Sequence, residues 1–501
     1  MTISRRSLIA ATALTPLATP QVWSQTSQPG SAQPASAPTA LRTRFAGRFT
    51  GDFDAMLERR FIRLVVPYSY TLFFEDKGVL YGITVDGAQL LEKWINKTFA
   101  LRAPQLTVPL TPVSRDKLFD TLLAGDGDIA AGDITITEER RKKVAFSEPV
   151  LRNVREIVVT GEDGPELGSP EALSGKEVVV GRSTSYYESL TKLNERLTAQ
   201  GKPPVSIRLV PDVLELADLM EMTAAGLLPA TVGDDWIAGL WAQIIKGLKL
   251  HPKAAVREGA EIAWAVRPDN PKLLATLNRA ITDITGNVTR WSDHTRSYLA
   301  KLKQLHTATR GADMQRFYNT VEIFRKYAGE YRFDTLLLLA QGYQESRLDQ
   351  TARSRVGAVG LMQLMPQTGR FLGVGDIRNA DPNVHGGAKY MAQLMDQYFK
   401  GDQFDEQNRT LFAFAAYDAG AGAIQRMRRE AEAQKLNPNL WFNNVERVAA
   451  ARLGQETVQY VRNIYKYYVA YKLIEEADAA KKAAIAGAKT QPATAVTSAP
   501  R

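Results

Sequence analysis

The sequence predicts a multidomain protein in which an α/β domain is followed by an all-α domain. Its 501 residues exceed the size of an ordinary single domain and predict two or three domains. In the first half, segments typical of strands alternate with amphipathic helices, which indicates an α/β architecture. After residue 285 apolar residues recur at helical spacing and no strand pattern remains, which indicates an all-α domain.

The composition narrows the functional classes. Hydrophobic residues make up 45% of the chain, so each domain can bury a core. The net charge of +9 favours an anionic partner, such as a cell-wall polymer, a membrane surface or nucleic acid. We expect no nucleic acid, because no recognisable nucleic-acid-binding motif accompanies the charge. With no cysteine in the chain, disulfides, thiol catalysis and a lipid-modified cysteine are excluded.

Metal and cofactor motifs are missing from the sequence. The four histidines lack the spacing of metal ligands. Neither a phosphate-binding loop nor a dinucleotide fingerprint is present. We therefore expect no metal site and no cofactor. The histidines are His251, His294, His306 and His385.

The first residues have the layout of an export signal. Arg5 and Arg6 precede the apolar run Leu8–Leu17, and small residues follow up to Ser24. We predict a signal peptide over residues 1–24, of the twin-arginine type, and a run too short to span a membrane. Residues 25–45 are rich in Ser, Pro, Ala and Gln and predict a disordered linker. We expect the mature protein in the periplasm or outside the cell.

The α/β domain is predicted over residues 46–290, followed by a joint over residues 291–312. One amphipathic helix is predicted at residues 87–98. The predicted strands of this domain are residues 62–66, 129–131, 156–160 and 177–180.

Several segments of this domain resemble the family 3 solute-binding proteins that serve amino-acid ABC transporters. They are Gly127–Pro149, Val180–Ser185, Thr231–Asp235 and Ile262–Pro268, in the family's order. The resemblance covers roughly residues 60–285 and implies two lobes with a ligand cleft between them.

The resemblance also implies a set of ligand-binding residues. Arg140 takes the place of the arginine that binds a ligand α-carboxylate, which suits a guanidinium. Thr135 is expected to bind the same group, and Asp234 to bind the α-ammonium. For Arg140 a solvated surface charge is an equal alternative, because residues 141–143 are all basic.

Asp133 departs from the family's pattern, because a small residue is common beside the bound carboxylate. A negative side chain there would repel an α-carboxylate or fill the cleft. We expect a small-molecule ligand, an amino acid or a muropeptide. Two alternatives stay open, namely a different ligand and a domain used for regulation or docking.

The all-α domain is predicted over residues 313–476, and residues 477–501 as a fraying helix and then a flexible tail. The Ala/Lys-rich end is typical of a solvated charged helix, with peripheral membrane contact as the weaker alternative. The predicted helices are residues 314–328, 335–346, 361–372, 384–399, 409–417, 423–435 and 457–476.

Glu345 is the candidate catalytic residue. Asp334 is placed to cap a helix that is too apolar for the surface, and Glu345 falls in its last turn. The free carbonyls and the negative end of the helix dipole disfavour a charged carboxylate there, as does burial. A carboxylic acid that stays protonated near neutral pH is a general acid. The alternative is an ordinary exposed glutamate.

The surroundings of Glu345 resemble the family 1 lytic transglycosylases, whose SLT-type domain has a goose-lysozyme-like fold. The matching segments are Glu345–Ser346, Ser354, Gly357–Ala358, Gly360–Pro366, Phe414–Gly420 and Glu456–Val461. A solute-binding domain followed by this domain resembles the F group of membrane-bound lytic transglycosylases. The implied partner is the glycan strand of peptidoglycan.

The resemblance implies that Glu345 acts first as acid and then as base. It would protonate the oxygen that joins N-acetylmuramic acid to N-acetylglucosamine, and then take the proton of the muramyl C6 hydroxyl. The product is a 1,6-anhydro sugar, and no water is consumed. The residues implied in substrate binding are Ser346, Ser354, Met362, Gln363, Tyr417, Asp418 and Tyr460.

Alternatives remain for several of these residues. Met362 and Tyr460 sit among apolar residues at helical spacing, where core packing is the commoner role. Asp418 replaces the family's asparagine, and a second carboxylate could hold a water and permit hydrolysis in the manner of lysozyme. A third reading is a binding protein whose helical domain attaches to the wall without cutting it.

Overall fold

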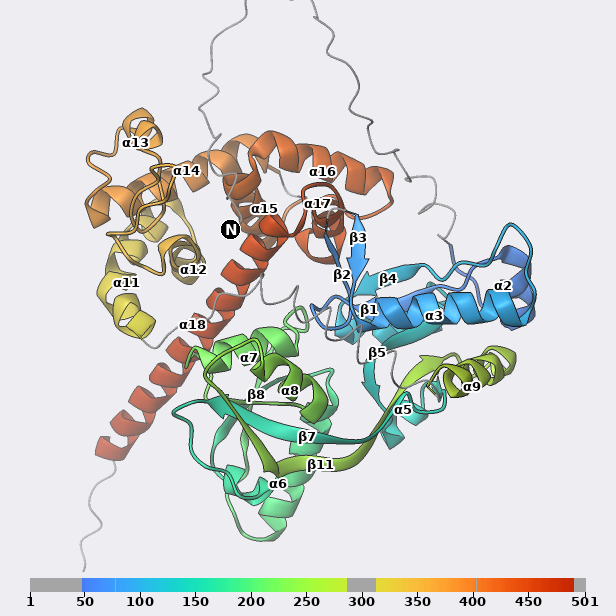
Figure 1. Cartoon of the computed structure of the whole chain (residues 1–501). Helices are drawn as coiled ribbons and strands as arrows, with labels where there is room; N and C mark the ends of the chain where they lie inside the picture. Colours follow the sequence, from blue (N-terminus) through green and yellow to red (C-terminus); the bar gives the residue numbers. More distant parts are fainter. Residues whose placement is uncertain (1–46, 77, 286–311, 402, 491–501) are drawn as a thin grey trace, which may run out of the picture.

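A computed structural model describes residues 47–76, 78–285, 312–401 and 403–490 (Figure 1). The predicted signal peptide and linker lie outside these residues, as do residues 491–501 of the tail and all but the last residue of the predicted joint. Figure 1 shows a two-lobed α/β part and a helical part, with the long helix α18 (Gln455–Thr490) running past both.

The α/β part contains one large sheet that passes through both lobes. Its strand order is β10-β7-β11-β5-β1-β4, and β6 pairs with β11. In the first lobe β1 lies between β4 and β5, and both pairings are parallel. The strands of the large sheet are β1 (Leu64–Pro67), β4 (Leu110–Val113), β5 (Ile129–Thr135), β6 (Ala145–Phe146), β7 (Leu151–Gly161), β10 (Ala230–Asp234) and β11 (Leu248–Val266).

Two long antiparallel strands connect the lobes. β7 and β11 pair with each other, while β7 also pairs with β10 of the second lobe and β11 with β5 of the first. The two-lobed α/β prediction is therefore confirmed. Two small sheets complete the part, one from β2 (Phe74–Asp76) and β3 (Val79–Tyr81) and one from β8 (Glu177–Gly181) and β9 (Ser206–Val210).

Helices pack on both lobes of the α/β part. The helix predicted at residues 87–98 begins four residues earlier, at Ile83, behind a tight turn at Gly82. The helices are α2 (Phe53–Arg59), α3 (Ile83–Thr98), α4 (Leu118–Leu123), α5 (Glu138–Arg141), α6 (Ser185–Ala199), α7 (Leu216–Ala224), α8 (Asp235–Ala242) and α9 (Pro271–Thr285), with 3-10 turns η2 (Arg115–Lys117) and η3 (Pro170–Leu173).

The C-terminal part is helical, as predicted. The helices are α11 (Ala312–Tyr331), α12 (Thr335–Ser346), α13 (Pro366–Leu372), α14 (Ala380–Tyr398), α15 (Glu406–Ala419), α16 (Ala421–Ala433), the π-turn η4 (Trp441–Val445), α17 (Glu446–Arg452) and α18. The sequence analysis did not predict η4 and α17, which lie between the helices expected at residues 423–435 and 457–476.

One predicted helix, over residues 361–372, is wrong in its first half. The chain forms a loop up to Met365, because Gly360 (φ 78°) and Gln363 (φ 44°) adopt left-handed backbone conformations. A β-bridge between Val359 and Leu364 closes this loop. The helix begins only at Pro366, a residue favoured at a first helical position.

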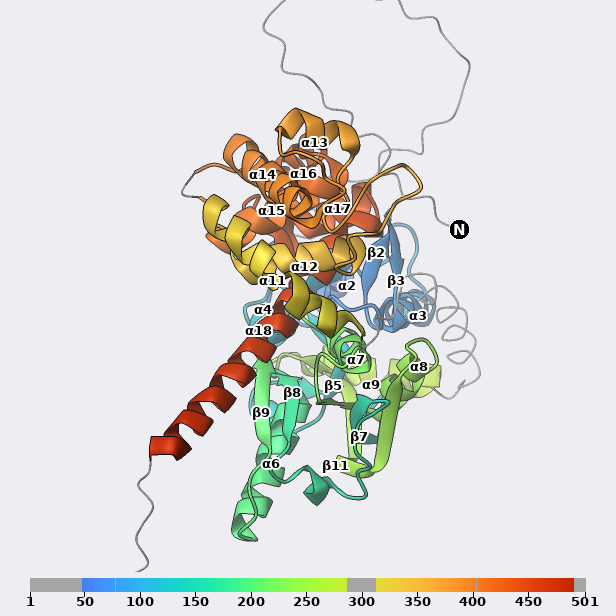
Figure 2. The same cartoon turned by 90° about the vertical axis from the view of Figure 1, so that its left-hand side faces the viewer.

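Helix α18 joins the two parts. It packs against α12 and α15 of the helical part and against α7 of the second lobe. Figures 1 and 2 show it passing from the helical part alongside that lobe. It continues to Thr490, fourteen residues beyond the predicted end of the domain. The two parts therefore share one long element.

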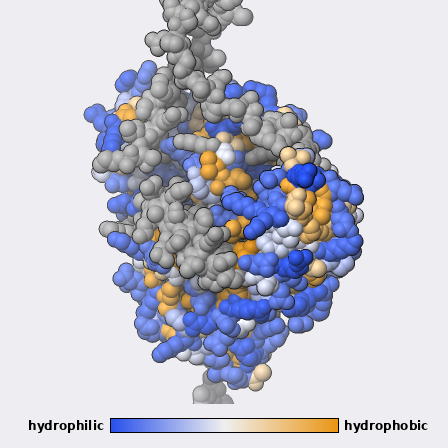
Figure 3. All heavy atoms as spheres, turned by 45° about the vertical axis from the view of Figure 1, so that its right-hand side comes forward, coloured by the Kyte–Doolittle hydropathy of each residue, from blue (hydrophilic) through white to orange (hydrophobic). Residues whose placement is uncertain are grey.

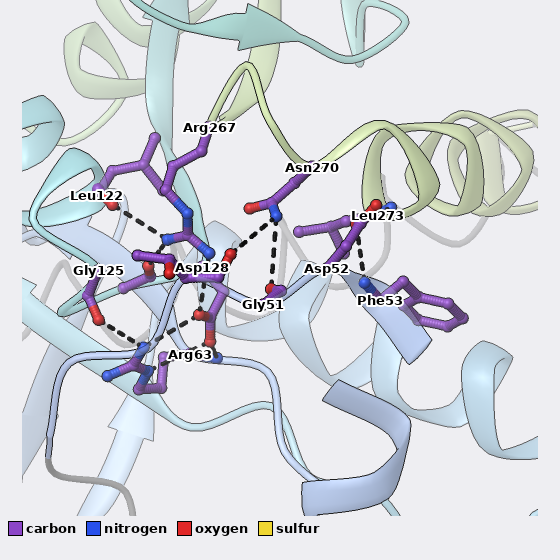
Figure 4. A network of polar contacts seen from close by, with 12 residues as sticks. Gly51, Asp52, Phe53, Arg63, Leu122, Gly125, Asp128, Arg267, Asn270 and Leu273 are labelled. Carbon is purple, nitrogen blue, oxygen red and sulfur yellow. Dashed lines mark hydrogen bonds and ion pairs between the residues drawn. The ribbon is translucent and has the colours of Figure 1, made fainter. Parts of the chain in front are cut away.

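A buried carboxylate organises the first lobe (Figure 4). Asp128 is fully buried, and its Oδ2 accepts the backbone N–H of Arg63 at 2.7 Å. Its Oδ1 pairs with the guanidinium of Arg63 at 3.0 Å and with that of Arg267 at 3.6 Å. Arg59 also pairs with it. Asp128 thus ties α2, β1 and the end of β11 to its own position before β5.

The face of the molecule that Figure 3 shows is mainly hydrophilic. On the face that Figure 3 shows, hydrophobic residues form small separate groups among hydrophilic ones. Across the described part of the chain, every helix is too short or too polar to span a membrane.

Replacing Asp128 by asparagine will destabilise the first lobe. The substitution leaves buried arginine charges without their anion, a change that costs about 3–5 kcal/mol. Urea unfolding followed by circular dichroism measures the loss. Asp269→Asn is the matched control, because Asp269 also pairs with Arg267, at 3.9 Å, but its side chain is 69% exposed. We expect the control to stay within about 0.5 kcal/mol of the wild type, and equal losses in both variants would contradict the role of Asp128.

Candidate active site

Glu345 lies in the last turn of a buried helix, as predicted. Asp334 caps α12 by accepting the backbone N–H groups of Leu336 at 2.8 Å and Leu337 at 3.2 Å. The helix is buried from Leu336 to Tyr343, while Glu345 itself is half-buried. Arg347, in a left-handed conformation (φ 57°), ends the helix. The carboxyl group therefore emerges from the core at the helix's C-terminal end.

A side chain from α18 holds the Glu345 carboxyl group. The Tyr460 hydroxyl donates a hydrogen bond of 2.6 Å to Glu345 Oε1. Gln341 Nε2 in turn donates to the Tyr460 oxygen at 3.3 Å, and both Gln341 and Tyr460 are buried. Tyr460 thus holds the carboxyl group, and Gln341 holds Tyr460. Tyr460, predicted to line the site, contacts the candidate acid directly.

Two hollows meet at Glu345. The larger has a volume of about 530 Å³ and the smaller about 60 Å³. Three residues line both hollows: Glu345, Gln363 and Asp418. A chain that occupied both hollows would therefore pass directly over the carboxyl group.

The loop before α13 carries Gln363 into the site. Gln363 Nε2 donates to the Gly360 carbonyl at 2.9 Å and to the Ala352 carbonyl at 3.3 Å. Asn383 on α14 is buried and holds the loop, since its Nδ2 donates to the carbonyls of Val359 and Ile377 at 2.8 Å each. Its Oδ1 accepts the Met362 N–H at 2.8 Å.

Met362 does not have the predicted substrate-binding position. Its side chain is fully buried and packs against Gly387 of α14, where an added Cβ would lie within 3 Å of it. The core-packing alternative is the correct one for this residue. Its contribution to the site is through the backbone, because its carbonyl accepts the Tyr417 hydroxyl at 2.8 Å.

The two predicted serines support the loops around the site. Ser346 lines the larger hollow, and its Oγ donates to the Leu361 carbonyl at 2.9 Å. Ser354 lines neither hollow, and its Oγ accepts the Ala358 N–H at 2.9 Å. Ser354 therefore shapes the loop without facing the site.

Tyr417 and Asp418, at the end of α15, face the site from the other side. Tyr417 lines the smaller hollow and packs edge-on against Tyr390 at a ring distance of 5.4 Å. Asp418 Oδ2 accepts the Thr457 hydroxyl of α18 at 2.8 Å. The residue that departs from the motif is thus fixed in the site next to Glu345.

Several lining residues were not predicted from the sequence. Three of them lie at intervals of four residues on α18, namely Gln459, Asn463 and Tyr467. This spacing puts them on one face of the helix, so their position next to Tyr460 could have been used to predict them. Glu221 comes from α7 of the second lobe, and no signal in the sequence places it there. The other unpredicted lining residues with functional groups are Tyr343, Gln344, Arg347, Arg353, Thr368, Tyr390 and Glu456.

The first half of α18 also binds both lobes of the α/β part. Gln455 Nε2 donates to the Tyr68 hydroxyl at 2.7 Å in the first lobe. Arg462 Nη1 donates to the Val213 carbonyl at 3.2 Å, and Lys466 pairs with Glu221. The helix that carries Tyr460 is therefore anchored to the α/β part within two turns of it.

Of the three residues predicted to bind a ligand, Arg140 lines the cavity between the lobes and Thr135 contacts Ser185 of the second lobe at 3.0 Å, while Asp234 does not line this cavity. Arg140 is nearly buried and donates to the carbonyls of Thr135 at 3.1 Å and Ser183 at 3.2 Å. It also pairs with Glu188 of the second lobe at 3.2 Å, so it is not a solvated surface charge. Asp234 is buried, with 1% of its surface exposed.

Metal ligands do not gather anywhere in the described residues. No group of three or more His, Cys, Asp or Glu side chains there is arranged to hold a metal ion.

Comparisons with known proteins agree with this two-part organisation. Residues 63–293 match the bacterial extracellular solute-binding proteins, family 3, and residues 322–440 match the transglycosylase SLT domain. The membrane-bound lytic murein transglycosylase F of Desulfosudis oleivorans is 30% identical over 378 residues, which cover 70% of this chain and 79% of that protein. The protein of the same name from Pseudomonas fluorescens is 28% identical over 434 residues, which cover 81% of this chain and 84% of that protein.

One solved structure that part of the chain matches is an ancestral amino acid-binding protein, a precursor of cyclohexadienyl dehydratase. The match covers 49% of this chain and 98% of that one, at 22% identity and a TM-score of 0.40.

Asn383→Asp will destabilise the helical part. The carboxylate keeps an acceptor but loses both donors to the loop carbonyls, and each buried polar group left unsatisfied costs about 1–3 kcal/mol. Thermal unfolding followed by circular dichroism should show a lower midpoint. Asn379→Asp, at the exposed start of the same helix, is the control and should be neutral or slightly stabilising. If Asn383→Asp and Asn379→Asp unfold at the same temperature, Asn383 does not stabilise the loop as described.

Proposed function

Because the chain belongs to the membrane-bound lytic murein transglycosylase F family, we propose that Glu345 is the acid and base of a peptidoglycan lytic transglycosylase. The observation that supports this role is the position of Glu345 between two hollows that share Gln363 and Asp418. A glycan strand that lay in both hollows would place one glycosidic oxygen beside the carboxyl group. The residues on either side would bind the sugars that flank the cleaved bond.

The reaction needs one carboxyl group in two steps. Protonated Glu345 gives its proton to the oxygen between N-acetylmuramic acid and N-acetylglucosamine, and that bond to the muramyl C1 breaks. The muramyl C6 hydroxyl attacks C1 and gives its proton to the Glu345 carboxylate, which restores the acid. Because the attacking hydroxyl belongs to the same sugar, the step is intramolecular, an advantage of up to about 7–11 kcal/mol.

Tyr460 positions the carboxyl group for both steps. Its hydrogen bond of 2.6 Å to Oε1 orients the group at the point where the two hollows meet. The bond also stabilises the carboxylate that exists between the two proton transfers, since hydrogen bonds to charged groups are the stronger ones.

Asp418 is the reason to keep hydrolysis as the second candidate. It lines both hollows with Glu345, as a water-activating carboxylate of a glycosidase would. Its hydrogen bond from Thr457 directs Oδ2 toward α18, which favours the transglycosylase reaction over this candidate.

We also propose that the N-terminal domain binds a small ligand in its cleft and regulates the catalytic domain. Glu221 of the second lobe lines the larger hollow, and its partner Lys466 lies on the helix that carries Tyr460. A movement of the lobes would therefore reach the active site through α18. The protein acts in the periplasm on the cell wall after export.

Glu345→Gln will abolish the cutting of purified sacculi and keep binding to them. Glutamine is nearly isosteric but cannot deliver the proton, so the release of soluble fragments should fall at least about 100-fold. Mass spectrometry of the wild-type products should find 1,6-anhydromuramyl ends, which are lighter by one water than reducing ends. Reducing ends would establish hydrolysis instead, and equal inertness of wild type and variant would establish a non-catalytic wall-binding protein.

Tyr460→Phe will slow the reaction about 10- to 100-fold, the equivalent of one hydrogen bond to a charged group. The rate of fragment release at saturating sacculus concentration measures this effect. Tyr465→Phe, five residues further along α18 and outside both hollows, is the matched control and should keep wild-type activity. A Tyr460→Phe variant as active as this control would remove Tyr460 from the mechanism.

A further inference from the structure

The cleft arginines are already neutralised by the protein itself. Arg115 of the first lobe pairs with Glu215 of the second at 2.7 Å. Arg140 of the first lobe pairs in the same way with Glu188 through Nε, and its other two nitrogens each donate to a backbone carbonyl. The Glu188 carboxylate therefore pairs with the guanidinium that would otherwise bind a ligand carboxylate. Both ion pairs cross the cleft and hold the lobes together.

Two neighbouring carboxyl groups remain without such a partner, that of Asp133, which lines the cavity between the lobes, and that of Asp234, which contacts Asp133. Asp133 lies near the end of β5 in the first lobe, and Asp234 lies at the end of β10 in the second. Within the described residues, no hydrogen-bond donor reaches either oxygen of Asp234 or Oδ1 of Asp133. Neither side chain forms an ion pair there. A buried carboxylate without donor or counter-charge is unfavourable, so it attracts a proton or a cation.

Burial gives both carboxyl groups of this pair a raised proton affinity. Burial raises the pKa of Asp133 to about 6, against the lowering effect of Arg115. Burial and the nearby Asp133 also raise the pKa of Asp234 well above its usual range. The charged or titratable groups that face the pair are Arg115 on η2, Glu156 on β7, Tyr186 on α6, Glu215 before α7 and Asp235 on α8.

The room beside Asp133 suits a small polar head group. The cavity that Asp133 lines with Ser69, Thr71 and Tyr186 has a volume of about 30 Å³. This is room for at least one water-sized group, and an ammonium group is of similar size. Hydroxyl groups of both lobes surround the space and can accept the hydrogens of an ammonium group.

We propose that the cleft binds an organic cation through Asp133 and Asp234, with a primary ammonium as the recognised group. The ligand needs no carboxylate, because Glu188 holds Arg140. Binding exchanges the shared proton of the carboxyl pair for the ligand's ammonium. This inference rests on the ligand-binding part of the proposed function and specifies the ligand's chemistry.

Isothermal titration of the purified protein with 1,5-diaminopentane tests the proposal, with glutarate as the dicarboxylate of the same chain length. We expect the diamine to bind and glutarate not to bind. Asp133→Asn and Asp234→Asn should each weaken diamine binding at least 10-fold. Asp163→Asn, an exposed aspartate of the same lobe as Asp234, is the control and should leave it unchanged.

Two further measurements separate this proposal from the amino-acid clamp of the family. Diamine affinity should be on the order of 10-fold higher at pH 7.5 than at pH 5.5, because the proton must leave before the cation binds. Glu188→Gln should create affinity for glutarate by freeing Arg140. The proposal is overturned if the diamine produces no heat at millimolar concentration. It is also overturned if alanine binds through Arg140 and Asp133→Asn strengthens that binding.

Thermal unfolding of each variant shows whether it is folded, and the diamine–glutarate comparison on the wild type needs no variant. Sacculus digestion is measured separately. A protein that cuts sacculi but ignores the diamine would refute this inference alone, while the reverse result would refute only the catalytic proposal.

Discussion

The hydrogen bond between Tyr460 and Glu345 is the interaction on which the active site depends. A carboxyl group at the C-terminal end of a helix receives no help from its own backbone, because the free groups there are carbonyls. Its orientation must come from another element, and here that element is α18. Gln341, from inside α12, completes the arrangement by holding the tyrosine. The two helices therefore fix the position of the Glu345 carboxyl group together.

The same helix also fixes the α/β part. Gln455, Arg462 and Lys466 bind both lobes from the first half of α18, on either side of Tyr460. Arg462 is buried against Glu446, so this section cannot turn without breaking a buried ion pair. The position of Tyr460 and the position of the lobes are thus mechanically linked. A regulatory domain needs such a link to have an effect.

Local patterns predicted the parts of the structure that depend on local sequence. The apolar run behind Asp334 was sufficient to place α12 and Glu345 within it. The loop at residues 360–365 was mistaken for helix, because its apolar residues have helical spacing while the backbone follows Gly360 and Gln363. The ion pair of Arg140 with Glu188 and the place of Glu221 in the site depend on contacts between distant elements. No periodicity in the sequence encodes them.

Asp418 and Asp133 stand where the related families commonly have other residues. Their surroundings differ, so the two replacements have different effects. Asp418 receives a hydrogen bond from Thr457 inside the protein, so its charge has a partner before any substrate arrives. Asp133 faces Asp234 across the cleft, and no donor in the described residues reaches the oxygens of Asp234. The first substitution can therefore modify a site without changing what the site binds. The second leaves buried carboxyl oxygens without a donor, and a proton or a cationic ligand can satisfy them.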